Sequence, residues 1–528
     1  MTSQKAKKAM AEKFYLTTSI AYINSSPHLG FAKEIVMADV LARHQRLLGK
    51  EVYFLTGTDE HGAKISRAAE KTGLPVEKFA DRNAEKFREL AEVLNISFDD
   101  FIRTSDKKRH FPGAQKMWRR LSEKGDLYKK SYRGLYCVGH EAFVTEKDLL
   151  DGKCVDHGQT PEIIEEENYF FKLSVYTERI KEAIVSGELV IAPASRKNEI
   201  LSLLEEGLED ISFSRPARDI SWGVPVPGDP EQTMYVWGDA LANYVSALGY
   251  GQEKETLFKK FWPADLHIIG KDILRFHAAV WPGMLLSAGL PLPKKILVHG
   301  FITVNGQKMS KTLGNVADPF VLAEKYGAEA VRYYLLRELS SFGDGDFTEE
   351  KFKESYNANL ANGLGNFVSR VNKMILQYFD GAIEKPAPAA LAAVPVNLEE
   401  VFIFKKETVE YFPPDYLIEN FFIPEYQKAM RELDLQKTGD IIWRLIGMLD
   451  GYIQDYEPFK LVKKDKEKAR AVLWQLAFGM FWIARLLAPF LPSTAEKIFS
   501  ILGVSGDAKP EKLKIFRFKE HKGLFPRL

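Results

Sequence analysis

The fold is decided by the stretch FYLTTSIAYINSSPHLGFAKEIVMADVLARHQRLL, residues 14–48. Its first ten residues are an apolar run with the length of a buried strand, and residues 31–48 repeat their apolar positions with a helical period. A second apolar run, VYFLTGT (52–58), precedes a second helix-period segment, Val76–Leu94. Strands that alternate with helices predict an α/β domain built on one sheet.

The residue patterns divide the rest of the chain. Residues 121–227 interrupt the alternation with both cysteines, the segment LLDGKCVDHGQ and the acidic run EIIEEEN, so we interpret them as an insertion. Strand-like ADLHIIG (264–270) and KILVHGFI (295–302) resume the sheet, and the Asn-Gly pair that follows predicts a hairpin. Beyond Thr348 we predict helices alone, with a Pro/Ala-rich linker at 385–397. The predicted parts are the first half of the sheet domain (1–120), the insertion (121–227), the second half (228–312), a connecting region (313–355) and a helical bundle (356–528).

Composition narrows the class of protein. The 528 residues include 73 Lys+Arg and 72 Asp+Glu, a balance that argues against binding polyanions by bulk charge, although a local basic face would escape this count. Two cysteines exclude a disulfide scaffold. We find neither a signal peptide nor a membrane-length apolar run, and we expect a soluble cytoplasmic protein without a membrane partner.

Two short motifs suggest phosphate chemistry. Pro27-His28-Leu29-Gly30 lies between a predicted strand and helix, where backbone N–H groups and an imidazole suit a phosphate and a glycine lets a nucleotide approach. The alternative is a capping turn with an incidental histidine. Lys308-Met309-Ser310-Lys311-Thr312 brings two ammonium groups that could neutralise a triphosphate, and its alternative is a solvated surface pair. Together, at two ends of one sheet, the motifs are more specific than either alone.

These motifs resemble the HIGH and KMSKS signatures of the class I aminoacyl-tRNA synthetases, and the chain as a whole resembles the methionyl-tRNA synthetase family. The resemblance rests on TSIAYINSSPHLG, FLTGTDEHG, ISFSRPARDISWGVPVP, YVWGDALANYVSALGY, HIIGKDILRFHAAVWPGML and GQKMSKTLGNV, and continues more faintly to the last residues. Phe31 stands where the family usually has histidine, which removes one possible donor to the nucleotide. Thr312 in place of serine keeps the hydroxyl.

The resemblance implies a Rossmann-like parallel-sheet catalytic domain with a zinc-knuckle insertion, followed by an all-α anticodon-binding bundle. The region 313–355 would hold the KMSKS loop and contact the tRNA stem. The implied reaction joins L-methionine to tRNA(Met) through methionyl-adenylate, with ATP and Mg²⁺. The implied catalytic residues are His28, Lys308 and Lys311, and the implied ATP contacts are His28, Gly30, Phe31, Asp272, Lys308, Met309, Ser310 and Lys311. A helix N-cap is the plain alternative for Asp272.

A methionine site also follows from the resemblance. Asp59 would bind the ammonium group, and Arg215 would pair with Asp59. The side-chain pocket would consist of Ile20, Tyr22, Trp237, Ala240, Tyr244 and His277. From the spacing alone, Trp237, Ala240 and Tyr244 would be the buried stripe of an ordinary helix. Asp59 has an independent argument, because it follows a predicted strand, where open α/β sheets place ligand groups.

The insertion carries a metal-ligand pattern. A histidine follows each cysteine after a two-residue gap, and Cys₂His₂ is a tetrahedral zinc pattern. We therefore expect one structural zinc ion. Its ligands would be Cys137, His140, Cys154 and His157. The alternative is two hydrophobic cysteines with surface histidines.

The helical region has residues suited to an unpaired anticodon. Asn366 and Arg370 lie four apart, hence on one helix face, and match family residues that contact anticodon bases. Phe459 stands where the family has a stacking tryptophan, and an aromatic face stacks an unpaired base. Because no appended dimerisation module follows the bundle, we expect a monomer.

Three rival interpretations are weaker. Other class I synthetases, such as those for isoleucine, valine and leucine, carry a large editing insertion for which the interval between the two motifs leaves no room. A small nucleotidyltransferase would need neither the bundle nor Asp59 with its aromatic pocket. A non-catalytic paralogue that binds tRNA or regulates is favoured by Phe31 alone. The intact residues that argue against it are His28, Asp59, Lys308 and Lys311.

Overall fold

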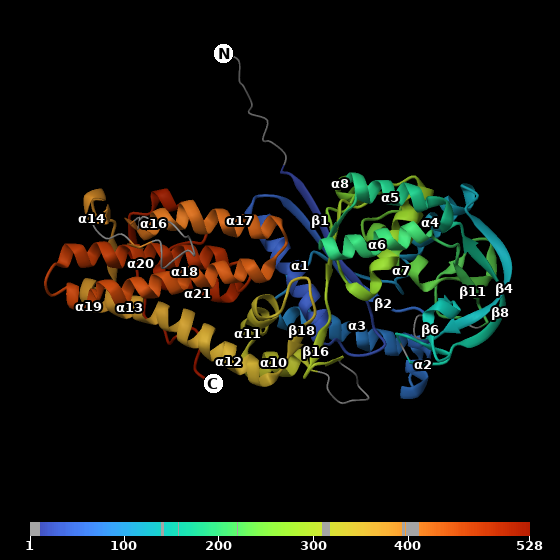
Figure 1. Ribbon diagram of the computed structural model, residues 1–528, viewed down its shortest axis with the longest axis horizontal. Coiled ribbons are helices and arrows are strands. Elements are labelled where there is room, and N and C mark those ends of the chain that lie inside the picture. Colours follow the sequence, from blue (N-terminus) through green and yellow to red (C-terminus); the bar gives the residue numbers. More distant parts are fainter. Residues whose placement is uncertain are drawn as a thin grey trace, which may run out of the picture. The chain divides into compact units, whose positions relative to one another are not determined.

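The computed structural model describes residues 11–138, 142–156, 158–218, 220–308, 317–392, 396–397 and 411–528. It forms two compact units, Met1–Phe301 and Ile302–Leu528 (Figure 1). Each unit has its own core and is described by itself below.

The first unit is built on a parallel sheet, as the strand and helix alternation predicts. The strands run in the order β3-β2-β1-β14-β15-β9, and each neighbouring pair is parallel. Their bounds are β1 Lys13–Tyr22, β2 Glu51–Asp59, β3 Asp100–Arg103, β9 Val190–Ala192, β14 Leu266–Gly270 and β15 Lys295–His299. A side chain on Gly57 of β2 would lie 2.2 Å from the carbonyl oxygen of Ile102, so glycine permits β3 to approach.

Helices cover this sheet. Apart from Gly30, all residues of α1 (Leu29–Leu47) up to Ala42 are buried; most of them are apolar, and the charged Lys33, Glu34 and Asp39 are buried with them. α4 (Phe111–Glu123) packs against α7 (Val236–Ser246) and α9 (Trp281–Ala288). The remaining helices of eight or more residues are α2 Ala63–Thr72, α3 Val76–Val93, α5 Thr177–Ser186 and α6 Ala194–Glu206.

The predicted insertion contains α5 and α6 and contributes strands to two antiparallel sheets. One sheet has the order β10-β8-β4-β5 and the other β11-β13-β12. The bounds are β4 Leu127–Cys137, β5 Ala142–Val144, β8 Glu162–Phe171, β10 Ile211–Ser212, β11 Ser214–Pro216, β12 Pro225–Val226 and β13 Asp229–Met234. The three-residue β9 also falls in the interval 121–227, yet it pairs with β15 at the edge of the parallel sheet. Three residues are too few to carry a periodic signal, so the sequence did not reveal this strand.

The second unit opens with the predicted hairpin. β16 (Ile302–Val304) pairs with β17 (Gln307–Lys308), and the two turn residues Asn305 and Gly306 have φ values of 53° and 73°. Two left-handed residues between paired strands are what an Asn-Gly hairpin requires, so this prediction is confirmed. β18 (Gly345–Phe347) pairs with the other side of β16.

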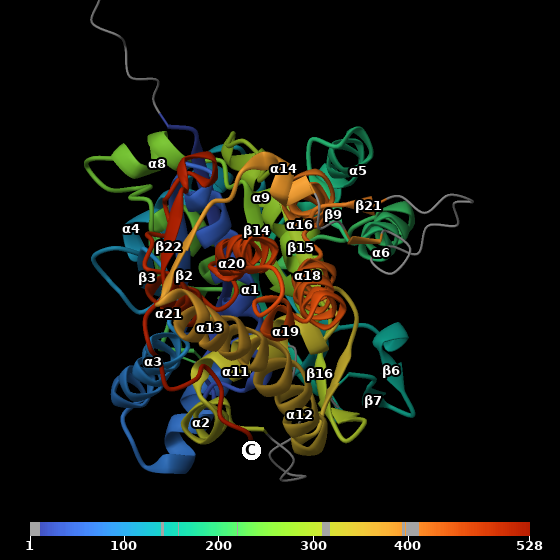
Figure 2. The ribbon, with the colours of Figure 1, turned by 90° about the vertical axis from the view of Figure 1, so that its left-hand side faces the viewer.

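Long helices make up most of the second unit, and Figure 2 shows α18 and α20 nearly end on. In the described part of this unit the α-helices of eight or more residues are α10 Pro319–Tyr326, α13 Asn366–Phe379, α17 Ile423–Arg431, α18 Leu435–Tyr456, α20 Lys466–Leu487 and α21 Pro492–Leu502, and the ten-residue π-helix Tyr356–Gly365 precedes α13. Within the described part of the chain, α20 alone has the length and hydropathy to cross a membrane. Its apolar window is 83% buried inside the protein, as expected of a core helix that contacts α13, α18 and α21.

The expectation of helices alone beyond Thr348 is wrong. β19 (Ala382–Glu384) pairs antiparallel with β22 (Ile515–Arg517), and β20 (Val396–Asn397) with β21 (Tyr411–Phe412). In the first pair Ile383 opposes Phe516, and both side chains are fully buried. Such short strands exist because segments remote in sequence pair, which local periodicity does not reveal. The unit is therefore predominantly helical rather than all-α.

Candidate active site

Three adjacent strands end at one edge of the parallel sheet and bring predicted site residues there. His28 follows β1, Asp59 is the last residue of β2, and Asp272 lies two residues beyond the end of β14. β1 is the first strand of the chain and lies between β2 and β14, so the strand order reverses at β1. Open α/β sheets bind ligands outside the carboxyl ends of their strands at such a reversal.

His28 occupies the cap of the first helix. Its imidazole Nδ1 accepts a hydrogen bond from the backbone N–H of Gly30 at 3.0 Å, so the neutral ring carries its proton on Nε2. A Cβ on Gly30 would lie 2.8 Å from the His28 ring. Glycine at position 30 therefore leaves room for the capping ring, a closer constraint than the nucleotide approach that we expected.

The side chain of Phe31 packs inside the first unit, and its contact with ATP stays a prediction. Its side chain is 8% exposed, and its ring meets the ring of Phe87 on α3 edge to face with centroids 4.7 Å apart. This ring contact holds the first turn of α1 against α3. Burying a large aromatic ring is favourable, which accounts for its place in the core.

Asp272 stands at the sheet edge as expected. It is exposed and lies inside the short 3₁₀ helix Lys271–Ile273, directly after β14. The N-cap of that helix is Gly270, so the alternative that Asp272 acts as a helix cap does not hold.

The predicted methionine pocket has an aromatic wall. Trp237 on α7 stacks on Phe276 with centroids 3.8 Å apart and an interplanar angle of 6°, and it meets His277 edge to face at 6.3 Å. Phe276 and His277 belong to a π-helical turn, Phe276–Val280, a distortion frequent at functional sites. Ala240 lies one turn beyond Trp237 and is buried. Phe276 has no sequence signal of its own and was not predicted.

Tyr244 and His277 form a hydrogen bond at the bottom of this wall. The Tyr244 hydroxyl lies 2.7 Å from His277 Nε2, and His277 Nδ1 lies 3.0 Å from the carbonyl oxygen of Ile273. Because a carbonyl only accepts, Nδ1 carries the proton and Nε2 accepts from the hydroxyl. Burial lowers the pKa of His277 to about 4, so the ring is neutral at pH 7.

The remaining pocket residues lie in the same region. Ile20 and Tyr22 of β1 are partly buried and pack, like Trp237, against the hydrophobic core that contains Tyr244. The ammonium group of Lys64 lies 5.6 Å from the centre of the Tyr22 ring. The structure thus joins the predicted pocket residues of β1 and α7 in one cluster.

Asp59 is buried beside this cluster, and Tyr22 is its register partner on β1. Its Oδ1 lies 3.4 Å from the backbone nitrogen of His61. Arg215 is held by two oxygen acceptors. Its Nη1 donates to Ser212 Oγ and to the Ser214 carbonyl, both at 2.7 Å. Its pairing with Asp59 remains a prediction.

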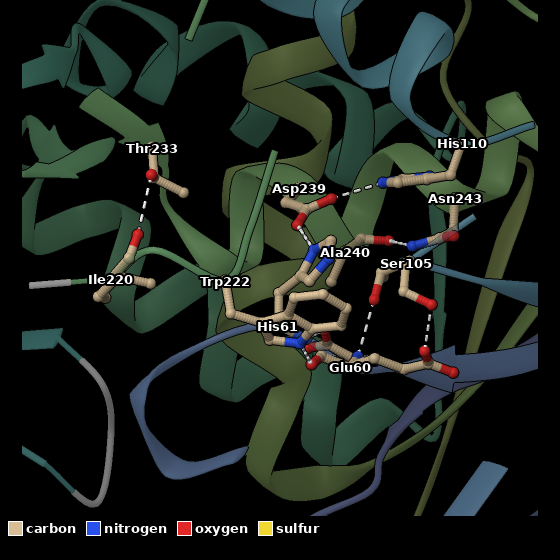
Figure 3. A network of polar contacts seen from close by, with 12 residues as sticks. Glu60, His61, Ser105, His110, Ile220, Trp222, Thr233, Asp239, Ala240 and Asn243 are labelled. Atoms are coloured by element: carbon tan, nitrogen blue, oxygen red, sulfur yellow. Dashed lines mark hydrogen bonds and ion pairs between the residues drawn. The ribbon is translucent and has the colours of Figure 1, made fainter. Parts of the chain in front are cut away.

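Sequence reasoning missed two buried charged groups beside Asp59. Glu60 is fully buried and accepts two hydrogen bonds from Arg103, at 2.7 and 2.9 Å. Asp239 of α7 is fully buried between His61 and His110 (Figure 3). The signal was present, because charged residues inside the apolar runs FLTGTDEHG and YVWGDALANYV need partners if buried.

The predicted zinc ligands are described in part. Cys137 at the end of β4 and Cys154 in the two-residue β7 (Lys153–Cys154) are both buried and pack in one small cluster with Val144. His140 and His157 lie outside the described residues. Within the described part of the chain no three metal-ligating side chains gather.

The lysine motif is also described in part. Lys308 ends β17, and the structure describes its backbone alone. Met309, Ser310, Lys311 and Thr312 lie outside the described residues, so the roles expected of them stay predictions.

In the second unit the predicted anticodon residues lie at the surface. Asn366 begins α13 and is exposed, and Arg370 lies one turn further on the same helix. Arg370 forms an ion pair with Asp450 of α18, with nitrogen and oxygen 2.5 Å apart. Phe459 is 39% exposed, and the ammonium group of Lys460 lies 5.8 Å from its ring centre.

Three features of the sheet together define a class I tRNA synthetase. HLGF follows the first strand, an acidic residue stands at or just beyond the end of each neighbouring strand, and a lysine motif follows the last strand in the sequence. A family model described as tRNA synthetases class I (M) matches residues 14–154 and 144–372. A second, the anticodon binding domain of methionyl tRNA ligase, matches residues 417–519. The chain belongs to the methionyl-tRNA ligase family.

Individual relatives agree with this assignment. A methionine--tRNA ligase of Caldanaerobacter subterraneus subsp. tengcongensis is 41% identical over 528 residues, which cover 98% of this chain and 79% of the relative. One of Brucella suis biovar 1 is 42% identical over 94% of this chain and 93% of its own. The solved Mycobacterium tuberculosis methionyl-tRNA synthetase in complex with methionyl-adenylate aligns with a TM-score of 0.89 and 37% identity, covering 98% of this chain and 100% of that chain.

Proposed function

We propose that this chain is a methionine–tRNA ligase. It activates L-methionine with ATP to methionyl-adenylate and transfers the methionyl group to the 3′ end of tRNA(Met). The observation that carries this proposal is the meeting of His28, Asp59 and Asp272 at the ends of three adjacent strands, beside the aromatic wall of Trp237.

The amino acid binds between Asp59 and α7. A buried carboxylate attracts the α-ammonium group, and aromatic rings provide soft contacts for a thioether. Ile20, Tyr22, Trp237, Ala240, Tyr244 and His277 form the side-chain pocket. Because His277 is neutral, the pocket presents no charge to an apolar side chain. Arg215 supports Asp59.

ATP binds along the strand ends. The N–H on His28 Nε2 donates to a phosphate, Gly30 keeps that ring in place, and Asp272 accepts from the ribose hydroxyls. We assign to Lys308, Met309, Ser310 and Lys311 the binding of the triphosphate, whose charge the two lysines neutralise and which brings Mg²⁺ with it. The methionine carboxylate attacks the α-phosphorus and pyrophosphate departs with its electron pair, so catalysis rests on positioning and charge neutralisation.

One zinc ion stabilises the insertion. The donor set fits, because the thiols of Cys137 and Cys154 are brought together in one buried cluster and soft thiolates suit zinc. His140 and His157 complete the four ligands. A closed set of four leaves no position for a catalytic water, so the ion is structural.

The second unit reads the CAU anticodon. Asn366 and Arg370 share one face of α13, and the exposed ring of Phe459 offers a stacking surface for an unpaired base. One chain carries both the site and this unit, and it acts as a monomer in the cytoplasm.

Aminoacylation with labelled methionine tests the proposal. Purified protein should charge a tRNA transcript with a CAU anticodon and should leave the same transcript with an altered anticodon uncharged. A protein that charges neither transcript contradicts the proposed function.

A further inference from the structure

The proposed reaction leaves one buried charged residue of α7 without a task. Asp239 Oδ2 lies 2.5 Å from His61 Nδ1, and its Oδ1 lies 2.5 Å from His110 Nε2 (Figure 3). The contact continues from His110 Nδ1 to Ser246 Oγ at 2.9 Å. Asp239 and Ser246 are seven residues apart and so lie on one face of α7.

The charge on this carboxylate determines the direction of its hydrogen bonds. Burial by itself raises the pKa of Asp239. The two histidine rings lower it by more than burial raises it, so that the pKa falls to about 2. An ionised carboxylate only accepts, so His61 Nδ1 and His110 Nε2 carry the hydrogens. Both bonds are charge-assisted and buried, which makes them strong and directional.

The network links the two halves of the amino-acid site. The backbone N–H of His61 donates to Asp59, the proposed ammonium anchor, while its ring donates to Asp239. Asp239 itself stands between Trp237 and Ala240 of the side-chain pocket. A single residue, His61, therefore contacts the anchor through its backbone and the helix of the pocket through its ring.

The segment that carries His61 is fixed independently. Arg103 holds the Glu60 carboxylate with two hydrogen bonds, and the Trp222 indole N–H donates to the Glu60 carbonyl at 2.5 Å. The ring of Trp222 also meets the His61 ring edge to face, with centroids 5.4 Å apart. Because this segment is anchored, Asp239 positions α7 against it.

We propose that Asp239 is a positioning residue that sets the distance between Asp59 and the pocket of α7, so that methionine is held at both ends at once. This inference rests on the proposed function and names the source of its amino-acid selectivity. Small displacements of positioning groups cost up to about 10²-fold in rate. The loss therefore falls on methionine and leaves ATP binding unchanged.

The direct test is the methionine KM of an Asp239→Asn variant in ATP–pyrophosphate exchange. An amide keeps the shape but has no charge and offers one acceptor oxygen where the carboxylate offers two, so both charge-assisted bonds are lost and one histidine must change its tautomer or lose its partner. We expect the methionine KM to rise at least about tenfold, with the ATP KM within about twofold. Asp126→Asn is the matched control, because Asp126 is a buried carboxylate that accepts from Ser287 and Tyr176 away from the site. It should leave both KM values unchanged.

A pair of substitutions at His61 separates positioning from stability. His61→Asn retains a donor in place of Nδ1 and should keep the methionine KM close to the parental value, whereas His61→Leu has no donor and should raise it as Asp239→Asn does. A purely structural role would lower the active fraction in all variants at unchanged KM, and that result overturns the inference. Parental protein without methionine-dependent exchange would instead refute the proposed function, and calorimetric methionine binding by the same variants then tests Asp239 directly.

Discussion

Tyr244→Phe removes one hydroxyl from the proposed methionine pocket and almost no volume. The hydroxyl donates to His277 Nε2 at 2.7 Å, and both side chains are 1% exposed. His277 stays neutral and keeps its other hydrogen on the Ile273 carbonyl, so Nε2 becomes a buried acceptor without a donor. Leaving a buried group unsatisfied costs about 1–3 kcal/mol.

The magnitude is measurable in two ways. Urea unfolding should show a free energy of unfolding lower by about 1–3 kcal/mol. In ATP–pyrophosphate exchange the methionine KM should rise, because the His277 ring is held less firmly, and the ATP KM should stay unchanged. Each loss of about 1.4 kcal/mol in methionine binding raises the KM about tenfold. Tyr128→Phe is the control, because that hydroxyl donates to Asp210, a partly exposed carboxylate that water can reach. Its cost should stay below about 1 kcal/mol.

A double-mutant cycle isolates the bond. Tyr244→Phe, His277→Leu and the double variant should give a coupling energy of about 1–3 kcal/mol, since residues in one hydrogen-bonded pair are not additive. Additive effects of the two substitutions, or a Tyr244→Phe protein with parental stability and methionine KM, would refute this reading of the pocket.

Four further predictions concern other parts of the molecule. Lys311→Ala should lower kcat of exchange with an unchanged methionine KM, and equal losses in affinity and rate would contradict a transition-state role. Elemental analysis should find about one zinc per chain. In Cys154→Ser the zinc content should fall while exchange activity is still close to parental. Parental protein without zinc would disprove the site. Arg370→Ala and Phe459→Ala should impair tRNA charging but spare exchange. For Phe459→Ala the loss in charging should correspond to about 1–3 kcal/mol, the contribution of one stacked base. If either variant charges tRNA at the parental rate, the assignment is refuted. Between pH 6.5 and 4 His277 is protonated in the unfolded chain but not in the folded protein. Acidification through this window should therefore lower the free energy of unfolding, by up to about 3 kcal/mol, and His277→Gln should lose less. Identical pH profiles of the two proteins would contradict this prediction.

The sequence predicted the sheet well because long periodic segments carry their own signal. The strands at residues 14–23 and 52–58 and the helix at 76–94 are found within a few residues of their expected bounds. The Asn305-Gly306 hairpin was equally clear, since left-handed residues are confined to few residue types. In contrast, β9, β19 and β22 each have three residues and depend on partners distant in sequence.

The sequence predicted the residues of the methionine site but not the buried residues that hold them in place. Asp59 and Tyr244 could be named from motifs, but the pairing of His61 and His110 with Asp239 joins three segments whose proximity only the fold creates. The packing of Phe31 against Phe87 was also not predicted, because its place in a signature motif carries no information on its neighbours in the core.

The most direct test of the central claim is amino-acid-dependent ATP–pyrophosphate exchange with each of the twenty amino acids. The pocket around Trp237 is lined by aromatic rings and a neutral histidine, with one buried carboxylate for the ammonium group. We predict robust exchange with methionine and little with leucine, isoleucine or valine. Exchange that is absent with methionine, or as fast with another amino acid, would contradict the account.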